Sequence, residues 1–455
     1  MRPNVVSQPA RSRRLVLIVT TLASFLTPFM GSSVTVALPA IGREFGLGPL
    51  GLSWVATSYL LAAAILLVPF GKLADARGRT RIFVAGMVVY TVASLGCTLS
   101  PSALLLMASR VAQGLGGAMV FGTSVAILTA AFPPEQRGRV IGINVAAVYL
   151  GLSLGPFLGG ILTEQLGWRS VFAGNVLAGL VTSLGAAWKL PRDARPPAAA
   201  GFDWPGTAFY SVGLAAIITG FSRLPGGTGL ALLAGGLLAA AAFVRRERAA
   251  VDPLLDLRLF SENRVFTFSN LAALINYAAT YAVAFLLSLY LQDLRGLGAQ
   301  SAGTLLVVQP IVQAVVSPFA GRLSDRLSAR LLASAGMAVI AAGLVGLAFI
   351  GLDVPLPRVA AALAALGVGF GLFSSPNTSA VMGSVQRSQY GVASATLATV
   401  RMTGQAFSMG IAMLVFALAG SATGSTSLPA VRAAFAVFAA LSVLGTFASL
   451  ARERE

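Results

Sequence analysis

The 455-residue sequence contains no histidine and a single cysteine, Cys97, which lies in an apolar run. Without histidine there is no imidazole to relay protons or to bind a metal ion. One cysteine cannot form an intrachain disulfide or a cysteine-based metal cage. We therefore expect no metal site and no bound cofactor.

Charged residues are also scarce, at 10% of the chain, whereas 56% of the residues are hydrophobic. Soluble domains contain about 25% charged residues. A membrane-spanning helix needs roughly 20 apolar residues, and helices satisfy their own backbone hydrogen bonds inside lipid. The repeated long apolar runs therefore predict an all-α integral membrane protein.

About fourteen apolar runs alternate with polar or charged segments, each long enough to cross a bilayer. They lie at residues 15–38, 51–70, 82–99, 102–129, 138–162, 168–189, 205–221, 228–244, 265–291, 299–319, 329–351, 358–376, 389–419 and 430–450. We expect an N-terminal six-helix half over residues 1–190, a linker with two inserted helices over 191–250, and a C-terminal six-helix half over 251–455. The first run is too long for a secretory signal, and further spans follow it directly.

The net charge of +17 does not indicate a nucleic-acid partner, because the lysines and arginines are scattered between the apolar runs. Such residues collect in the cytoplasmic loops of membrane proteins. With both termini in the cytoplasm, the loops predicted to face outside hold only Arg43, Arg169, Arg223, Arg295, Arg358 and Arg432. We expect a multi-pass plasma (inner) membrane protein that acts as a monomer, in contact with the lipid bilayer and a small-molecule substrate.

One loop pattern occurs twice. Gly71 is followed by Asp75 and arginines after the second run, and Gly321 is followed by Asp325 and Arg326 after the tenth run. Both loops follow the second helix of a six-helix group. The repeat predicts two related halves that rock about a central site.

Several motifs connect the sequence to a known family. They comprise Gly71, Asp75, Gly78, Arg79 and Arg81 in the first loop; Arg110, Gln113, Gly114 and Gly116 in a pattern RxxQGxG; Gly151, Gly155, Pro156, Gly159 and Gly160 in GLSLGPFLGG; Gln292, Arg295 and Gly296; and Arg401 and Gly404. In these motifs the chain resembles the major facilitator superfamily, and its fourteen-helix drug:proton antiporter branch in particular. The resemblance implies two pseudo-symmetric six-helix halves plus two central helices, alternating access, and export coupled to an ion gradient, in this branch a proton gradient.

The chain departs from this branch at Met30, where the branch usually has an acidic residue. All fifteen Asp and Glu residues lie in loops or at the predicted helix ends. This departure leaves the proton-carrying group of such an antiporter without a candidate.

Two arginines fall within the apolar runs. Arg110 lies about a third of the way into its run, with Gln113 on the same side, and Arg401 is followed by Gln405. An arginine in this position should face a cavity or a partner, or reach the membrane interface with its long side chain. In a cavity, two arginines without carboxylates would favour anionic or zwitterionic ligands, or backbone carbonyls.

The other motifs also allow two interpretations. The four-residue spacing of Gly151, Gly155 and Gly159 lets a neighbouring helix approach closely, which is either packing alone or, by the resemblance, the antiporter motif that seals an export path. Asp75 forms either a solvated ion pair or, as its repeat at Asp325 suggests, part of a gate at the cytoplasmic side.

Polar and aromatic residues that interrupt the apolar runs are candidates for a substrate cavity, although each could instead make an interhelical hydrogen bond. They are Ser32, Ser33, Thr35, Trp54, Tyr59, Asn144, Tyr149, Asn270, Asn276, Tyr277, Tyr281, Gln309, Gln313 and Asn377.

These observations favour a secondary transporter that exports drug-like or amphiphilic molecules. Alternatives are a dedicated metabolite, organic-anion or lipid transporter of the same fold, or a receptor that does not transport. The sequence has no phosphate-binding GxxxxGK[ST] motif and no clustered acid, base or metal ligands in the membrane, which argues against an ATPase or an enzyme. A channel would need a continuous polar stripe.

Overall fold

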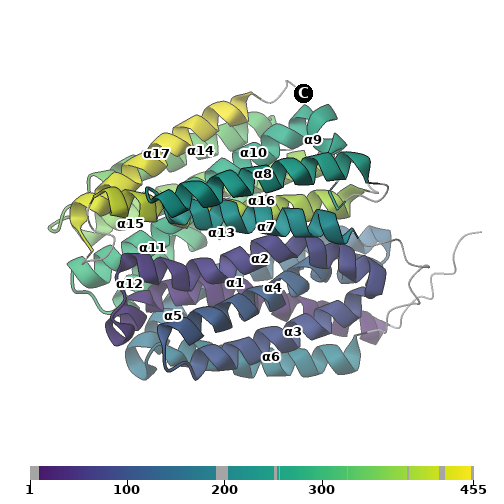
Figure 1. Cartoon of the computed structure of the whole chain (residues 1–455), viewed down its shortest axis with the longest axis horizontal. Helices are drawn as coiled ribbons and strands as arrows, with labels where there is room; N and C mark the ends of the chain where they lie inside the picture. The colour runs from purple at the N-terminus through teal and green to yellow at the C-terminus, as the bar shows by residue number, and fades with distance from the viewer. Residues whose placement is uncertain are drawn as a thin grey trace, which may run out of the picture.

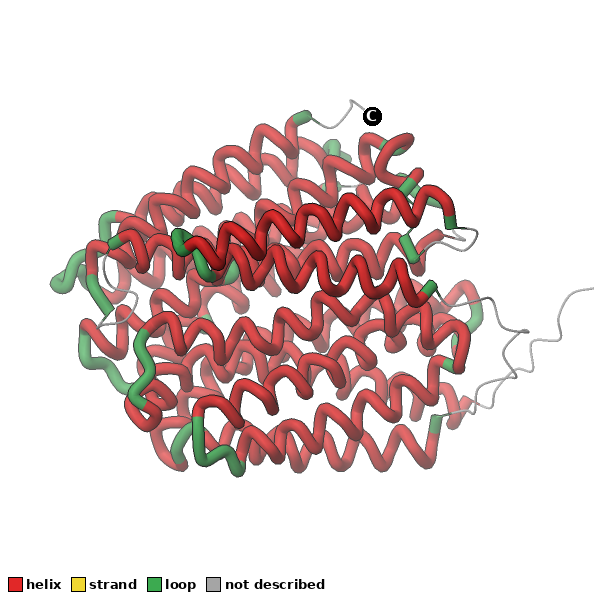
Figure 2. The backbone as a smooth tube through the Cα atoms, in the orientation of Figure 1, coloured by secondary structure: helices red, strands yellow, loops and turns green. Residues whose placement is uncertain are grey.

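The computed structural model describes residues 10–190, 203–250, 254–255, 257–324, 326–386, 389–419 and 426–451. This part of the chain is helical throughout, with long helices running side by side and most connecting loops gathered at the two ends of the bundle (Figures 1 and 2). Thirteen of its helical stretches are long and apolar enough to cross a membrane. The predicted all-α membrane fold is therefore confirmed.

The first six helices form one group, in which α1 packs on α5, α4 lies against α2 and α3, and α6 packs on α3. Small residues allow these close contacts, as at Gly116, where a side chain would collide with the backbone of Tyr90. The helices are α1 (Ala10–Phe45), α2 (Pro49–Arg77), α3 (Arg79–Thr98), α4 (Ala103–Ala131), α5 (Pro134–Leu166) and α6 (Arg169–Lys189).

Two helices, α7 (Trp204–Ser222) and α8 (Gly227–Ala249), pack against each other between the two groups (Figure 1). Helix α7 is 19 residues long, which is enough to span a bilayer, so about fourteen spans result, as predicted. It contacts both α2 and α16: the Tyr210 hydroxyl donates to the Ala64 carbonyl, and the Phe221 ring lies 5.8 Å from that of Phe407.

The remaining helices form the second group, in which α14 packs on α15 and α17, and α10 packs on α16 and α17. They are α9 (Arg258–Glu262), α10 (Arg264–Thr280), α11 (Ala282–Leu289), the π-helical turn η1 (Tyr290–Leu294), α12 (Ala299–Leu306), α13 (Val308–Leu323), α14 (Ala329–Ala348), α15 (Leu356–Gly383), α16 (Tyr390–Leu418) and α17 (Leu428–Leu450).

Two predicted spans of this group are interrupted rather than continuous. The run predicted over 265–291 is divided at Tyr281. The Ala282 amide there donates to the Ser408 hydroxyl of α16 at 2.9 Å. The run predicted over 299–319 is divided at Val307, three residues before Pro310, which has no amide hydrogen to donate. Neither interruption follows from hydropathy, because both lie within apolar sequence.

Two hydrogen bonds join the two groups at the end of the bundle that carries Gly48, Gly167 and Gly298, here called the outer end after the predicted topology. The Gln292 amide donates to the Val36 carbonyl at 3.0 Å, and Glu164 accepts from the Gln300 amide at 2.7 Å. Each bond crosses from one group to the other. The two groups are thus held in contact at this end.

Candidate functional site

A cavity of about 200 Å³ lies between the two helix groups. Residues of both groups line it, which makes it the natural candidate for a central site. The lining residues are Thr27, Pro28, Gly31, Ser32, Thr35, Val36, Tyr59, Leu60, Phe121, Val148, Tyr149, Leu152, Pro156, Tyr277, Thr280, Tyr281, Ala284, Leu306, Gln309, Pro310, Gln313, Phe370, Arg401, Met402 and Gln405.

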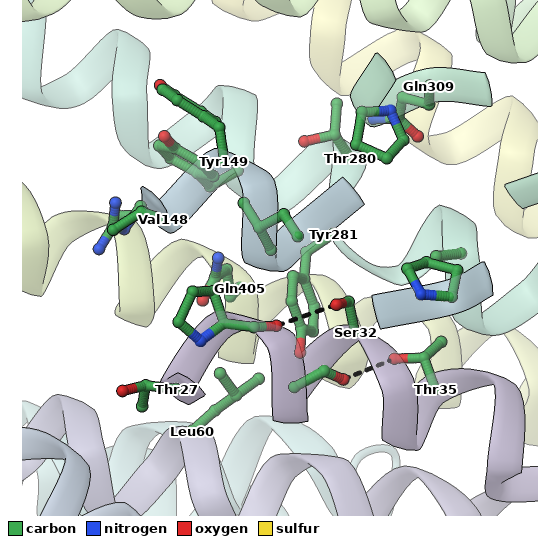
Figure 3. Close-up of a pocket in the computed structure, with 18 of the residues that line it drawn as sticks. Thr27, Ser32, Thr35, Leu60, Val148, Tyr149, Thr280, Tyr281, Gln309 and Gln405 are labelled. Carbon is green, nitrogen blue, oxygen red and sulfur yellow. Dashed lines mark hydrogen bonds between the residues drawn. The ribbon is translucent and has the colours of Figure 1, made fainter. Parts of the chain in front are cut away.

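One face of α1 supplies hydroxyl groups to this cavity. Ser32 donates to the Pro28 carbonyl at 2.9 Å and Thr35 donates to the Gly31 carbonyl at 3.1 Å (Figure 3). These bonds satisfy the hydroxyl hydrogens inside the helix, so the oxygens remain available as acceptors. The four-residue spacing of Gly31 and Thr35 follows the helical repeat and places both on the same side.

Four tyrosines form much of the aromatic surface, namely Tyr59, Tyr149, Tyr277 and Tyr281. The Tyr149 hydroxyl lies 2.8 Å from the Ser374 hydroxyl on the opposite group, and the Tyr277 ring packs edge-on against Phe370 at 5.4 Å. In Figure 3, Tyr281 lies close to Ser32, and Tyr149 lies on the opposite side of the view. Such walls suit flat, apolar molecules.

Among the described residues that line the cavity, Arg401 alone carries a charge. Gln405 lies one turn further along α16, and Gln309 and Gln313 line the cavity from α13. No described carboxylate lies within 4.0 Å of the Arg401 guanidinium. The site therefore combines aromatic walls, neutral amides and one cation.

Arg110 does not line the cavity; of the alternatives considered from the sequence, it meets protein partners. It is 1% exposed and lies behind Tyr59, with its guanidinium carbon 4.6 Å from the centre of that ring. Nε donates to the Val55 carbonyl at 3.2 Å and Nη1 donates to Gln113 at 2.6 Å. The hydrogen bonds extend from Gln113 to Ser94 at 2.8 Å. Arg110 is thus enclosed by its own helix group.

The glycines of α5 face two different neighbours. A side chain at Gly151, Gly155 or Gly159 would collide with α1, and one at Gly160 would meet the Ala299 carbonyl of the other group at 2.6 Å. Close packing is therefore real at all four positions. Pro156 itself lines the cavity.

The segment predicted as a loop after the second run is helical on both sides of Gly78, because α2 continues to Arg77 and α3 begins at Arg79. Arg79 pairs with Asp75 at 2.8 Å, and both side chains are exposed. Gly78 has a φ of 109°, which suits glycine and allows the sharp turn between the helices. Gly71 has open space beside it, and Arg326 is exposed in the corresponding second loop. Asp325 lies outside the described residues, and Arg81 has an interaction partner.

Other predicted cavity residues also lie elsewhere. Ser33 and Gln113 are buried within the first group, Trp54 is partly buried in α2, and Asn144, Asn270, Asn276 and Asn377 are almost fully buried but away from the cavity. Met30 is fully buried too. A polar residue in an apolar helix looks the same in sequence whether it faces a cavity or a neighbouring helix.

The sequence prediction also omitted lining residues. Thr27 and Thr280 carry the polar signal that identified the others and could have been included. Most of the rest are apolar, such as Leu60, Phe121 and Met402. No sequence signal separates an apolar residue that faces a cavity from one that faces lipid.

The sequence profile described as "Major Facilitator Superfamily" matches residues 20–409 and 270–455. The chain is 32% identical over 391 residues to "Riboflavin transporter RibZ" of Clostridioides difficile (strain 630), covering 86% of this chain and 85% of that protein. It is 33% identical over 420 residues to "Multidrug resistance protein Stp" of Mycobacterium tuberculosis (strain ATCC 25618 / H37Rv), covering 91% and 78%.

A solved structure has a similar fold. The crystal structure of a D-xylose-proton symporter aligns with a TM-score of 0.70, covering 97% of this chain and 98% of that one, at 13% sequence identity. At this identity the likeness concerns the arrangement of the helices.

Proposed function

Because the chain belongs to the major facilitator superfamily, we propose that it works by alternating access as a secondary active exporter of drug-like or amphiphilic aromatic molecules. Like its relatives, the protein is a multi-pass membrane transporter; it is not an enzyme. We propose that it acts as a monomer in the plasma (inner) membrane. We propose that both termini lie in the cytoplasm, because that topology puts most lysines and arginines inside.

The observation that carries the proposal is a cavity lined by both helix groups, which are joined by hydrogen bonds at the outer end. The bonds Gln292 to Val36 and Glu164 to Gln300 hold the outer end together, beyond the cavity. A rocking motion that breaks these bonds and closes the other end would move the same cavity to the opposite side.

The substrate class follows from the cavity wall. Four tyrosines and two phenylalanines offer flat apolar surface, while hydroxyls and amides offer hydrogen bonds. Relatives named for riboflavin transport and for multidrug resistance support aromatic, drug-like substrates. The GLSLGPFLGG segment, which resembles the exporter motif, supports the outward direction.

The energy source is proposed to be an ion gradient, and the resemblance to antiporters favours protons. The described cavity lining contains no carboxylate, so any proton carrier would have to lie elsewhere in the chain. A dedicated organic-anion transporter is therefore a second candidate, favoured by Arg401 as the charge in the cavity.

Alternating access can be tested by fixing the outer end closed. In a Cys97→Ser background, Glu164→Cys and Gln300→Cys would be joined by a short bis-maleimide, since these residues are in contact now. Riboflavin, naphthalene-1-sulfonate and trimethyl-1-naphthylammonium would each be loaded into proteoliposomes, and their release followed by fluorescence.

We expect at least one probe to leave faster than from protein-free vesicles, and we expect the cross-linker to stop its release. Each single-cysteine protein, treated with the same reagent, is the control. Unchanged release from the cross-linked protein would contradict alternating access, and absence of release for all three probes would contradict the proposed transport function.

A further inference from the structure

We propose that the transported solute is an aromatic organic anion whose charge pairs with Arg401, and that the membrane potential therefore contributes to driving its export. This inference rests on the proposed function and names the substrate class of the same cavity.

The first argument is the charge of the cavity. Arg401 lines it without a described carboxylate within 4.0 Å, and the other described lining residues, among them Tyr277 with which Arg401 interacts, are neutral and provide no negative charge. A cation held in a low-dielectric site is costly unless it is paired. A carboxylate, sulfonate or phosphate on the solute would supply the missing partner, whereas a cationic solute would meet a like charge.

A second cation strengthens the same field. The Arg110 guanidinium lies 4.6 Å from the ring of Tyr59 on the side away from the cavity, and it too has no described carboxylate in contact. Tyr59 lies within the electrostatic influence of both arginines. The cavity wall therefore has a positive potential on the Tyr59 side as well as at Arg401.

The aromatic walls of the cavity indicate what the uncharged part of the solute is. Tyr149, Tyr277, Tyr281 and Phe370 surround the same space from α5, α10, the junction of α10 with α11, and α15. Aromatic rings stack on flat apolar groups and gain little from flexible polar chains. A compact aromatic ring with one acidic substituent satisfies both the walls and Arg401.

The charge of the solute provides a driving force that does not require a proton acceptor in the cavity. Among the described residues no Asp, Glu or His lines the cavity, and an arginine stays protonated. The charge moved with each molecule is then the charge of the solute itself. A potential of 100 mV, negative inside, favours outward movement of a monoanion about 50-fold, in addition to any ion gradient that the transporter uses.

The test uses proteoliposomes containing the full chain and two probes of the same ring, naphthalene-1-sulfonate and trimethyl-1-naphthylammonium. Potassium gradients with valinomycin set the membrane potential, and the pH is the same inside and outside the vesicles. Release of the anion should accelerate when the interior is negative and slow when the potential is reversed. The cation should leave at least ten-fold more slowly than the anion under matched driving forces.

Three variants separate the charge of Arg401 from its packing. Arg401→Gln should lower anion release at least ten-fold and raise the ratio of cation release to anion release. An unfolded protein would lose the release of both probes and would not change their ratio in this way. Arg401→Lys retains the charge and should keep release within a few-fold of the original. Arg358→Gln removes an exposed arginine outside the cavity and should leave release unchanged.

Preferred transport of the cation, or anion release that is unaffected by Arg401→Gln, would overturn the anion assignment while leaving a transporter. Anion release that follows a pH gradient and ignores the potential would overturn the proposed energy source. Absence of release for both probes and for riboflavin would remove the proposed transport function, and this inference with it.

Discussion

Arg110 and Arg401 have similar positions in the sequence, each within an apolar helix and followed by a glutamine on the same side. In the structure their surroundings differ. Arg110 is enclosed by Val55, Gln113 and the ring of Tyr59, whereas Arg401 faces the central cavity. An arginine that is already surrounded by protein groups stabilises the fold, and one that faces a cavity is available to a solute.

The difference arises from the neighbouring helices. Ser94 on α3 accepts hydrogen bonds from Gln113 at 2.8 Å and from Asn175 on α6 at 2.9 Å, so three helices join around Arg110. Helix α16 is instead part of the wall between the two groups at Arg401. The role of each arginine is set by its partners and not by its own sequence motif.

The largest difference is expected from replacing each arginine by alanine. Arg110→Ala should lower the free energy of unfolding by about 3 kcal/mol or more, because Gln113 loses its donor and a buried cavity remains. Arg401→Ala should change stability much less. Thermal unfolding of the solubilised proteins measures both, and equal losses would show that the two arginines do not differ in this way.

The two glutamines extend the comparison. Gln113→Leu should cost about 1–3 kcal/mol, because it leaves Arg110 Nη1 buried without its acceptor. Gln405→Leu, at a partly exposed cavity position, should change stability by about 0.5 kcal/mol or less and should alter which solutes are transported. Chemical denaturation and competition between probes provide the measurements. A stable Gln113→Leu protein would argue against the hydrogen-bonded cluster.

Tyr59 belongs to both surroundings, since its ring covers Arg110 and lines the cavity. Tyr59→Leu should cost about 1–2 kcal/mol by removing the contact between the cation and the ring, whereas Tyr59→Phe keeps the ring and should be milder. Both unfolding temperature and probe affinity should be recorded. If the Tyr59→Phe and Tyr59→Leu proteins have the same unfolding temperature, the ring contact does not stabilise Arg110.

The smallest effect is expected at a surface ion pair, which serves as a reference for the buried charges. Asp75→Asn removes the partner of Arg79, but both side chains are exposed, so the loss should be below about 1 kcal/mol. If Asp75 contributes to gating, the transport rate should change while unfolding does not. If the Asp75→Asn protein has the transport rate and the unfolding temperature of the original, Asp75 forms only a solvated ion pair and does not contribute to gating.

Hydropathy predicted the spans well but not their interruptions. Long apolar runs necessarily become helices in lipid, and α14 begins at Ala329 as predicted. The divisions at Tyr281 and Val307 depend on contacts with other helices, such as the bond from Ala282 to Ser408. A window of hydropathy contains no information about such partners.

The candidate site was predictable only in part. Ser32, Tyr281, Gln309 and Arg401 were identified because polar and aromatic groups stand out in an apolar helix, and they do line the cavity. The same criterion also selected Asn276, which is fully buried elsewhere. Helical periodicity places residues on a face but does not say which neighbour that face meets.

The sequence by itself determined that this chain spans a membrane with about fourteen helices and belongs among transporters, because composition, loop charge and motif spacing are properties of the chain alone. Only the tertiary structure decided which groups meet at the cavity. It brings Tyr59 and Arg401 from opposite helix groups to one space and keeps Arg110 behind the wall. The physical reason is that a site between helices depends on distances across the bundle, which no single helix specifies.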